Sequence, residues 1–483
     1  MGNAALKIDE KTRVPVSMQD VSALDKLVRF VNERKDKPFI PGDFNRFERE
    51  LAERLREAGR EALQEDLRKA DVDAEAVLIE SLQHRRVLRG TETYMTTMGP
   101  VTVERTLYKD RTDPGARAVA ALEARLGIIG GLWTPEAAKQ ATWVVSQMTP
   151  GLSEELFARV GNMRPSKSSL DRLPKEIHDR WEDDRLAFEA ELRTVTEIPE
   201  ETKSIAISID GVLAPMKDGG AVETRARAAN DGRLSKGPAG YREVGCATIS
   251  FCDEDGEMIS AIRMARMPEA KKKTLKASLL AELGALLAQR PDLPVVKVAD
   301  AAQDNWSFLG TQIPGGPEII DFFHAAEHLG QAVAAAYGDG TRETRLRFQE
   351  LREILLEDCG GVEHVIRSLT YLRSKYPRKK RIAEVLSYFR KHRIRMRYFE
   401  HKELGLPIGS GPVEAACKTL VAQRMKQSGM RWGMEGGQGI LTVRGWTQSE
   451  RFEHAWALLA STYQLQITVL DNVVAFPTRH FPA

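Results

Sequence analysis

The segment Ser204-Ile-Ala-Ile-Ser-Ile-Asp210 constrains the fold more strongly than any other part of the chain. Its isoleucines recur at every second position and Gly211 follows the last residue, which is typical of a buried strand that ends in a turn. Two further β segments run from Tyr241 to Phe251 and from Glu257 to Arg263. The turn sequence Asp253-Glu-Asp-Gly256 lies between them, so the sequence predicts a hairpin next to the first strand.

The order of the following elements indicates the kind of sheet. Lys273 to Gln289 is an amphipathic helix, Val295-Val-Lys-Val-Ala is a short buried strand before Asp300, and Glu318-Ile-Ile-Asp-Phe-Phe is another strand. Strand, hairpin, helix, strand, strand is the order of a ribonuclease H-like sheet. We therefore expect an α/β fold with a ribonuclease H-like mixed sheet.

The remaining sequence is mainly helical. Ala325 to Leu404 is almost entirely helical in pattern, which predicts an all-helical insertion in the sheet domain. The predicted organisation has four parts: a mainly helical N-terminal region (1–198), a first part of the catalytic core (199–324), the insertion (325–405), and a second part of the core with C-terminal helices (406–483).

The N-terminal region contains two smaller features. Glu92 to Lys109 is β-rich with a turn at Gly99-Pro100, which predicts a small hairpin. Further on, a short helix capped by Ser153, a break at Gly161-Asn162 and a helix capped by Ser166 fit a helix-turn-helix that binds DNA. A plain helical hairpin fits the same pattern.

Composition and charge exclude several classes of protein. With 483 residues, 42% hydrophobic and 29% charged, the chain has material for two or three packed cores. The net charge is only +2 and the pI is about 8.2, so any nucleic-acid surface must be local. The four cysteines form no C-x-x-C pair, which argues against a cysteine-based zinc site and fits a reducing cytoplasm.

The sequence also lacks the signals of secretion and membrane insertion. Met1 to Lys7 has no basic segment followed by an apolar run, and no stretch of about 18 apolar residues occurs. We therefore expect a cytoplasmic protein with no membrane partner.

Three carboxylates stand at positions that suit metal chemistry. Asp210 and Asp300 each follow an apolar strand, and Glu414 lies in the first turn of a helix that Ser410 or Gly411 would cap. Such residues also serve to cap a turn or to complement a helix dipole. Hard carboxylate oxygens in a group of three suit two Mg²⁺ or Mn²⁺ ions in phosphoryl transfer, although composition does not select these three among 69 acids.

A family resemblance selects them. The motifs that carry it are Asp210-Gly211, Val298-Ala-Asp-Ala-Ala302, Asp321-Phe-Phe-His-Ala-Ala-Glu-His-Leu329, Ile408-Gly-Ser-Gly-Pro-Val-Glu-Ala-Ala-Cys-Lys418 and Val421-Ala-Gln-Arg-Met-Lys-Gln-Ser-Gly-Met-Arg-Trp432. Together they resemble the ISKra-type bacterial insertion-sequence transposases over about Ile205 to Glu450. These enzymes are related to the Mutator-like group, in which a helical insertion interrupts a ribonuclease H-like core.

The resemblance implies a function and the residues that perform it. Asp210, Asp300 and Glu414 would be the catalytic metal ligands for two Mg²⁺ or Mn²⁺ ions. His324, in a D-x-x-H motif on the last core strand, would lie near the scissile phosphate or the metal site, unless it is only a packed histidine. Double-stranded DNA would be the partner, both as terminal inverted repeats and as target, and a homodimer or higher oligomer would form on it. Paired cysteines that relatives often carry after the N-terminal hairpin are absent here.

Two basic stretches predict where DNA binds. Tyr371 to Arg381 and Arg390 to Tyr398 hold a dense run of cations with only Glu384 between them, although a solvated helix face is the usual alternative. A second set follows Glu414, and its first member, Lys418, would either pair with that glutamate or hold a phosphate. The predicted DNA-binding residues are Arg378, Lys379, Lys380, Arg381, Arg390, Lys391, Arg393, Arg395, Lys418, Arg424, Lys426 and Arg431.

The function expected from the sequence is that of a DNA transposase. It would bind element ends and catalyse metal-dependent cleavage and strand transfer by in-line phosphoryl transfer. Two alternatives stay open, a non-mobile ribonuclease H-like nuclease and a domesticated DNA-binding protein without catalysis. A glycosidase would need sugar-stacking aromatic residues near its acids, and the aromatic content is only 7%.

Overall fold

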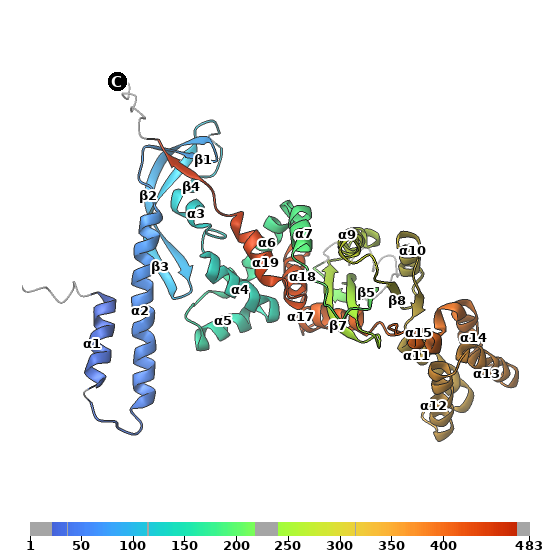
Figure 1. Ribbon diagram of the computed structural model, residues 1–483. Coiled ribbons are helices and arrows are strands. Elements are labelled where there is room, and N and C mark those ends of the chain that lie inside the picture. The colour runs from blue at the N-terminus through green and yellow to red at the C-terminus, as the bar shows by residue number, and fades with distance from the viewer. Residues whose placement is uncertain (1–21, 36, 114, 218–239, 314, 471–483) are drawn as a thin grey trace, which may run out of the picture. The chain divides into compact units, whose positions relative to one another are not determined.

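The computed structural model describes residues 22–35, 37–113, 115–217, 240–313 and 315–470 (Figure 1). The N-terminal residues considered above for a secretion signal lie outside these ranges. The chain divides into two compact units. The first unit comprises Met1–Gln140, Glu154–Ser166 and Ala460–Ala483, and the second comprises Ala141–Ser153 and Lys167–Leu459.

The first unit contains a five-stranded antiparallel sheet in the order β10-β1-β2-β3-β4. Its elements are α1 (Ala23–Lys35), α2 (Phe44–Ala70), β1 (Ala76–Ile79), β2 (Leu82–Thr96), β3 (Gly99–Asp110), β4 (Val119–Ala120), α3 (Ala121–Leu126) and β10 (Ile467–Val469). The helices α4 (Pro135–Gln147) and α5 (Pro150–Val160) are divided between the units, because Ala141–Ser153 belongs to the second.

This sheet is larger than the predicted small hairpin. The hairpin exists as β2 and β3, and Gly99 at its turn has a φ of +107°, which only glycine adopts easily. The sheet also includes β10, which comes from the C-terminal region and pairs with β1, with Ile467 opposite Ile79 (Figure 1). The C-terminal part, predicted to hold core residues and helices, thus also contributes a strand. The sequence did not indicate it, because a three-residue strand has no local signal of its own.

The second unit contains the remaining elements. They are α6 (Lys167–Asp183), α7 (Arg185–Thr194), β5 (Ser204–Pro215), β6 (Tyr241–Cys252), β7 (Met258–Arg266), η1 (Ala270–Lys272), α9 (Lys273–Gln289), β8 (Val295–Ala299), α10 (Gln303–Gln312), β9 (Glu318–Ile320), α11 (Phe322–Tyr337), α12 (Arg342–Glu357), α13 (Gly361–Lys375), α14 (Lys380–His392), η2 (Arg393–Met396), α15 (Tyr398–Glu403), α16 (Gly411–Ala416), η3 (Cys417–Ala422), α17 (Gln423–Met425), α18 (Met434–Gln448) and α19 (Phe452–Ser461).

The sheet of this unit has the strand order β7-β6-β5-β8-β9. The pairs β7/β6 and β6/β5 are antiparallel, whereas β5/β8 and β8/β9 are parallel. A parallel pair needs a crossover connection, and α9 and α10 provide these connections. The mixed sheet covered by helices confirms the predicted α/β class.

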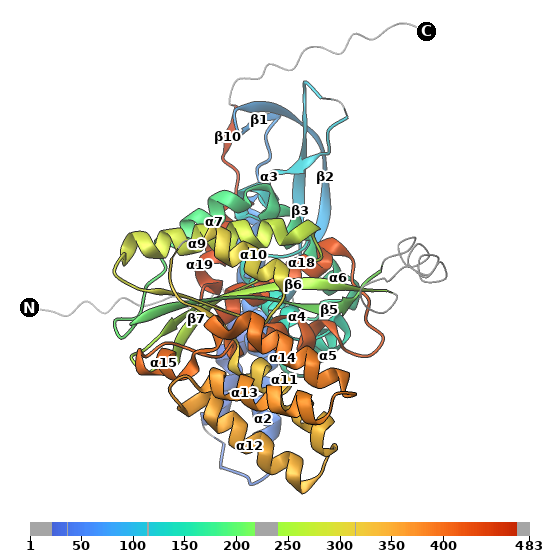
Figure 2. The same cartoon turned by 90° about the vertical axis from the view of Figure 1, so that its right-hand side faces the viewer.

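Both faces of this sheet are covered. On β6, Val244 and Cys246 belong to a core cluster shared with α16 and η3, whereas Ala247 and Ile249 belong to a cluster shared with α9. Alternation along a strand sends neighbouring side chains to opposite faces. In Figure 2, α9 lies on one side of β5, β6 and β7.

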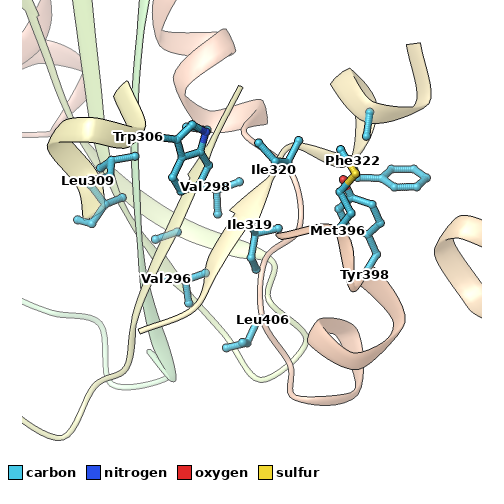
Figure 3. Close-up of a cluster of buried hydrophobic side chains, with 14 of the residues drawn as sticks. Val296, Val298, Trp306, Leu309, Ile319, Ile320, Phe322, Met396, Tyr398 and Leu406 are labelled. Carbon is cyan, nitrogen blue, oxygen red and sulfur yellow. The ribbon is translucent and has the colours of Figure 1, made fainter. Parts of the chain in front are cut away.

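The helical insertion begins directly after the last core strand. Phe322 and Tyr398, from the two ends of the insertion, meet edge to face with ring centroids 5.1 Å apart. Ile319 and Ile320 of β9 lie beside Phe322, Met396 and Tyr398 in Figure 3 and share one buried cluster with them. The insertion is thus anchored on the sheet by residues just before its start and near its end.

Two further details differ from the expected helix boundaries. Helix α5 begins at Pro150, and the Thr149 hydroxyl accepts a hydrogen bond from the backbone N–H of Leu152 (3.1 Å). Ser153, the predicted cap, is instead fully buried within the helix.

Most of α5 belongs to the first unit and α6 to the second, so the helix-turn-helix stays a prediction. No helix in the described ranges is both long and apolar enough to cross a bilayer.

Candidate active site

Asp210 lies within a strand rather than at its end. β5 continues to Pro215, and its whole length pairs with β6, with Asp210 opposite Cys246. The expectation that β5 stops at Asp210 was wrong, since Val-Leu-Ala-Pro after Gly211 also finds partners on β6. The neighbouring parallel strand β8, however, pairs only with Ile205 to Ile207. Asp210 therefore lies beyond the part of β5 that pairs with β8.

Asp300 stands on that side, immediately after β8. One of its carboxylate oxygens accepts hydrogen bonds from the backbone N–H of Ala302 (3.1 Å) and the side-chain amide of Asn305 (3.2 Å). The same Asn305 amide donates to the carbonyl oxygen of Ile209 (3.1 Å). Asn305, which is only 4% exposed, therefore ties Asp300 to the strand position just before Asp210.

Asp210 and Asp300 line one cleft of about 1040 Å³. Burial raises the pKa of the Asp210 carboxyl, and the negative charge of Asp300 raises it further. Hydrogen bonding to the Gly211 N–H, the charge of Lys272 and a bond from the Cys417 thiol (3.7 Å) act in the opposite direction. The two carboxylates thus repel each other in a recess open to a ligand.

Glu414 lies in the first turn of α16, as predicted. The carbonyl oxygen of Ser410 accepts from the N–H groups of Val413 (3.0 Å) and Glu414 (3.1 Å), so the helix begins at this serine. The chain then passes into the π-helical turn η3, a type of turn often found at functional sites. This turn begins with Cys417, which reaches Asp210.

The charges around Glu414 place it in the same neighbourhood. Burial raises the pKa of Glu414, and the charges of Asp321 and Asp210 raise it further. The Ser410 hydroxyl, 3.4 Å from Glu414 Oε1, and the charge of His324 lower it. Hydrogen bonds support this placement: the Cys417 thiol, three residues after Glu414, reaches Asp210, and the Ser410 N–H, four residues before it, is bound by Asp321 at the start of α11.

Asp321 holds the loop before Glu414 in place. Its buried carboxylate accepts from the backbone N–H of His324 (2.6 Å), as a helix cap does, and from the backbone N–H of Ser410. The carbonyl of Ile408 also accepts from the N–H of Phe322 (3.0 Å). Asp321 is therefore a positioning residue that connects two segments on either side of the insertion.

His324 lies in the first turn of α11 and not on the last core strand, because β9 ends at Ile320. Its ring centroid is 4.9 Å from that of His328, which in turn lies 4.3 Å from that of Tyr388. The Tyr388 hydroxyl is buried without a hydrogen-bond partner among the described residues. Burial raises the pKa of Tyr388 above its usual range, and the charges of Asp300 and Asp321 raise it further.

The carboxylates partly fit a metal site. Among the residues that the structure describes, no three His, Cys, Asp or Glu side chains lie close enough together to form a ligand set. Asp210 and Asp300 nevertheless provide hard oxygen donors in one cleft, and a divalent cation would relieve the repulsion that raises the Asp210 pKa. These two residues could hold a cation, whereas Glu414 does not line their cleft.

Some of the predicted DNA-binding residues have exposed side chains, whereas others form contacts with other residues of the protein. Arg390 is exposed and donates to the Thr370 hydroxyl (3.2 Å). Lys418, exposed as well, is not within ion-pair distance of Glu414 in the described structure. The other exposed members are Arg378, Lys379, Lys380, Lys391, Arg393, Lys426 and Arg431.

Three of the predicted cations are engaged inside the protein. Arg424 is only 1% exposed and donates from two nitrogens to the carbonyl of Val145 (3.1 and 3.2 Å), so it does not belong to a DNA surface. Arg395 pairs with Glu318 (2.7 Å) and lies over the ring of Trp306. Arg381 donates to the side chains of Gln331 and Glu384. The sequence does not show whether the side chain of a basic residue in a motif points to solvent or into the protein.

The structure adds residues that sequence reasoning missed. Asn305 and Cys417 contact Asp300 and Asp210, and Lys272 donates to the carbonyl of Asp210 (3.1 Å). Asn305 follows Asp300 by five residues on α10, which is a signal that sequence spacing alone could have provided. Cys417 and Lys272 meet Asp210 only through the packing of η3 and η1 against the sheet.

Comparisons with known proteins add little. No protein-family model and no curated protein matches the chain. Among solved structures, the chain is similar to the Drosophila P element transposase strand transfer complex, with 13% sequence identity over 68% of this chain and 81% of that chain, at a TM-score of 0.25. A similarity at this TM-score carries no weight for fold or function, so the site has to be interpreted from its own geometry.

Proposed function

We propose that the protein is a DNA transposase of the DDE type, a metal-dependent polynucleotidyl transferase. The observation that carries this proposal is the placement of Asp210 and Asp300 in one cleft, with Asp210 in contact with Cys417, which directly follows the helix that carries Glu414. The motifs of the ISKra-type transposases contain these three acids. The strand order β7-β6-β5-β8-β9, three antiparallel strands followed by two parallel ones, supports a ribonuclease H-like core.

Each acid has its own task in this proposal. Asp210 and Asp300 would hold a divalent cation, Mg²⁺ or Mn²⁺, and Glu414 would add the third carboxylate. A bound pair of such ions supplies Lewis acidity and aligns the attacking and leaving oxygens of an in-line displacement. Asn305 fixes the direction of Asp300, and Asp321 fixes the segment that carries Glu414. His324 would contact the DNA phosphate near Glu414.

DNA would lie across the cleft and along the exposed cations of the insertion. Arg378, Lys379 and Lys380 stand at the turn between α13 and α14, where they can reach phosphates of a duplex. Terminal inverted repeats and target DNA are the expected partners, and a homodimer or higher oligomer would bring two ends together.

The proposal is tested with a plasmid that carries the gene with its flanking DNA. In the presence of Mg²⁺ or Mn²⁺, the wild-type protein should release the element ends and join them to target DNA, and a chelator should abolish both reactions. Glu414→Gln, Asp210→Asn and Asp300→Asn should lower both by more than about 100-fold while keeping DNA binding. Glu327→Gln, an exposed acid on α11, is the matched control and should retain appreciable activity.

The outcomes separate the proposal from its alternatives. Robust cleavage by Glu414→Gln would place the third carboxylate elsewhere. Metal-dependent cleavage without any joined product would favour a non-mobile nuclease. DNA binding without cleavage by the wild-type protein would favour the domesticated DNA-binding protein.

A further inference from the structure

A strained loop stands at the edge of the cleft that holds Asp210 and Asp300. Between β7 and α9, Lys271 has φ +54° and ψ +22°, and Lys272 has φ +54° and ψ +41°. This left-handed conformation is unfavourable for a residue with a side chain. Two such residues in succession persist only where their surroundings hold them, and this kind of strain is common at functional sites.

Contacts to the sheet hold this loop. The ammonium group of Lys272 pairs with Glu243 Oε1 on β6 (2.7 Å) and donates to the carbonyl of Asp210 on β5 (3.1 Å). Glu269 accepts a hydrogen bond from the backbone N–H of Leu275 (2.9 Å), which closes the loop onto the start of α9. Lys272 is thus an anchor between the loop and the strand that carries Asp210.

Two glycines leave the space for this anchor. Gly211 and Gly245 lie opposite each other on β5 and β6, directly beside the pair formed by Asp210 and Cys246. A Cβ atom on Gly211 would stand 2.1 Å from Glu243 Oε1, and one on Gly245 would stand 3.3 Å from the Lys272 side chain. Neither glycine has a positive φ, so both serve to make room rather than to turn the chain.

The loop and helix present two cations that the anchor does not use. Lys271 and Lys276 line the same cleft as Asp210 and Asp300. Within the described ranges, neither lysine is within ion-pair distance of a carboxylate, and Lys276 lies 5.0 Å from the ring centroid of Phe308. Burial lowers the pKa of Lys276, the charges of Lys272 and Lys271 lower it further, and Asp304 acts in the opposite direction. An anion between these lysines would offset their mutual repulsion.

We propose that Lys271 and Lys276 form a binding site for one phosphate of a DNA backbone. The site lies at the edge of the cleft, and the helix that carries Glu414 packs on the opposite face of the sheet. The site rests on the proposed function, because a strand held at Asp210 and Asp300 would continue past this loop. Helix α9, which carries Lys276, and helix α16, which carries Glu414, cover opposite faces of the sheet, so the phosphate site and Glu414 would contact the strand from different elements. Lys272 and the glycine pair are positioning residues of this site.

The test measures binding of a short, fluorescently labelled DNA duplex to the full chain over a series of salt concentrations, with a chelator present. The variant Lys271→Gln/Lys276→Gln should bind more weakly and lower the slope of log affinity against log salt by about 0.9, the value for one lost phosphate contact. Lys273→Gln is the matched control, since Lys273 is exposed, carries the same charge and does not line the cleft. Its slope should equal that of the wild type, and all variants should unfold at the same temperature.

The result separates this site from the proposed function. An unchanged slope in the double variant, or an equal loss in Lys273→Gln, would overturn the phosphate site. Because the chelator prevents cleavage, the measurement does not depend on catalysis. A wild-type protein that binds DNA through these lysines but never cuts it would refute the proposed chemistry and leave the binding site supported.

Discussion

The carboxylate of Asp321 accepts the backbone N–H of Ser410, a residue 89 positions further along the chain. Asp321 directly follows the last core strand, and Ser410 precedes the helix that carries Glu414. The entire helical insertion lies between them in sequence. One buried side chain thus closes the core across the insertion and sets the position of the third candidate catalytic acid.

The first prediction concerns this contact. Asp321→Asn should lower the free energy of unfolding by about 2 kcal/mol, because the amide cannot accept both N–H groups as a carboxylate does and the site is fully buried. Chemical denaturation measures the loss. Glu327→Gln, an exposed change of the same kind on α11, should cost less than about 0.5 kcal/mol. Equal stability of both variants would show that Asp321 does not join the two segments.

The second prediction concerns the close contact between α6 and α18. A Cβ atom on Gly439 would lie 2.0 Å from the carbonyl oxygen of Pro174, whereas one on Gly436 would lie 3.6 Å from the nearest atom of Lys175. Gly439→Ala should therefore destabilise the protein by about 2–3 kcal/mol. Gly436→Ala should be neutral or stabilising by up to about 1 kcal/mol, because alanine favours helix. Thermal unfolding of the two variants compares them, and a neutral Gly439→Ala would contradict the packing.

The third prediction is a pH dependence. The raised pKa of Asp210 means that the folded protein holds this proton more tightly than the unfolded chain does. Its contribution to stability is thus fully present below the unfolded pKa and is lost as pH rises through the folded pKa. Without metal, Asp210→Asn should match the wild type at acidic pH and become the more stable of the two near neutral pH.

The same comparison with Mg²⁺ tests the cation. Added Mg²⁺ should raise the melting temperature of the wild type near neutral pH and have little effect on Asp210→Asn, because the carboxylate is a proposed ligand. An identical response of both proteins would argue against a cation at Asp210.

The fourth prediction concerns the exposed basic turn between α13 and α14. Changing Arg378, Lys379 and Lys380 to glutamine should lower the salt dependence of DNA binding by about 0.9 for each phosphate contact that is lost. The control changes Arg342, Arg345 and Arg347 on α12, which are also exposed. Equal effects in the two triple variants would indicate that the turn is part of a solvated helix face and not a specific DNA-binding site.

The fifth prediction separates two neighbouring cations that look alike in sequence. Arg424→Gln should destabilise the fold by about 2 kcal/mol or more, since it removes a buried guanidinium from the carbonyl of Val145. Lys426→Gln, at an exposed position, should leave stability within about 0.5 kcal/mol of the wild type. Denaturant unfolding of both variants decides whether Arg424 has the structural role that its burial indicates.

The sequence determined the elements of the second unit and their order. The isoleucines before Asp210, the hairpin after it and the apolar residues before Asp300 are local patterns that burial in a sheet imposes on any chain. Glu414 was predicted in the first turn of a helix and lies there, because a serine, two glycines and a proline set a helix start locally. The metal chemistry of the three acids remains a prediction from resemblance and residue type.

Tertiary structure decided everything that depends on residues distant in sequence. β5 continues past Asp210 because these residues pair with β6. β10 completes a sheet that begins almost 400 residues earlier in the chain. Arg424 points into the protein because the carbonyl of Val145 on α4 accepts its hydrogen bonds. The hydrogen bond from Lys272 to the carbonyl of Asp210 needs space that two glycines provide, and these glycines pair with each other across two strands. Such contacts leave no periodic pattern along the chain, since each depends on register and on the approach of another element, and only the folded protein fixes these.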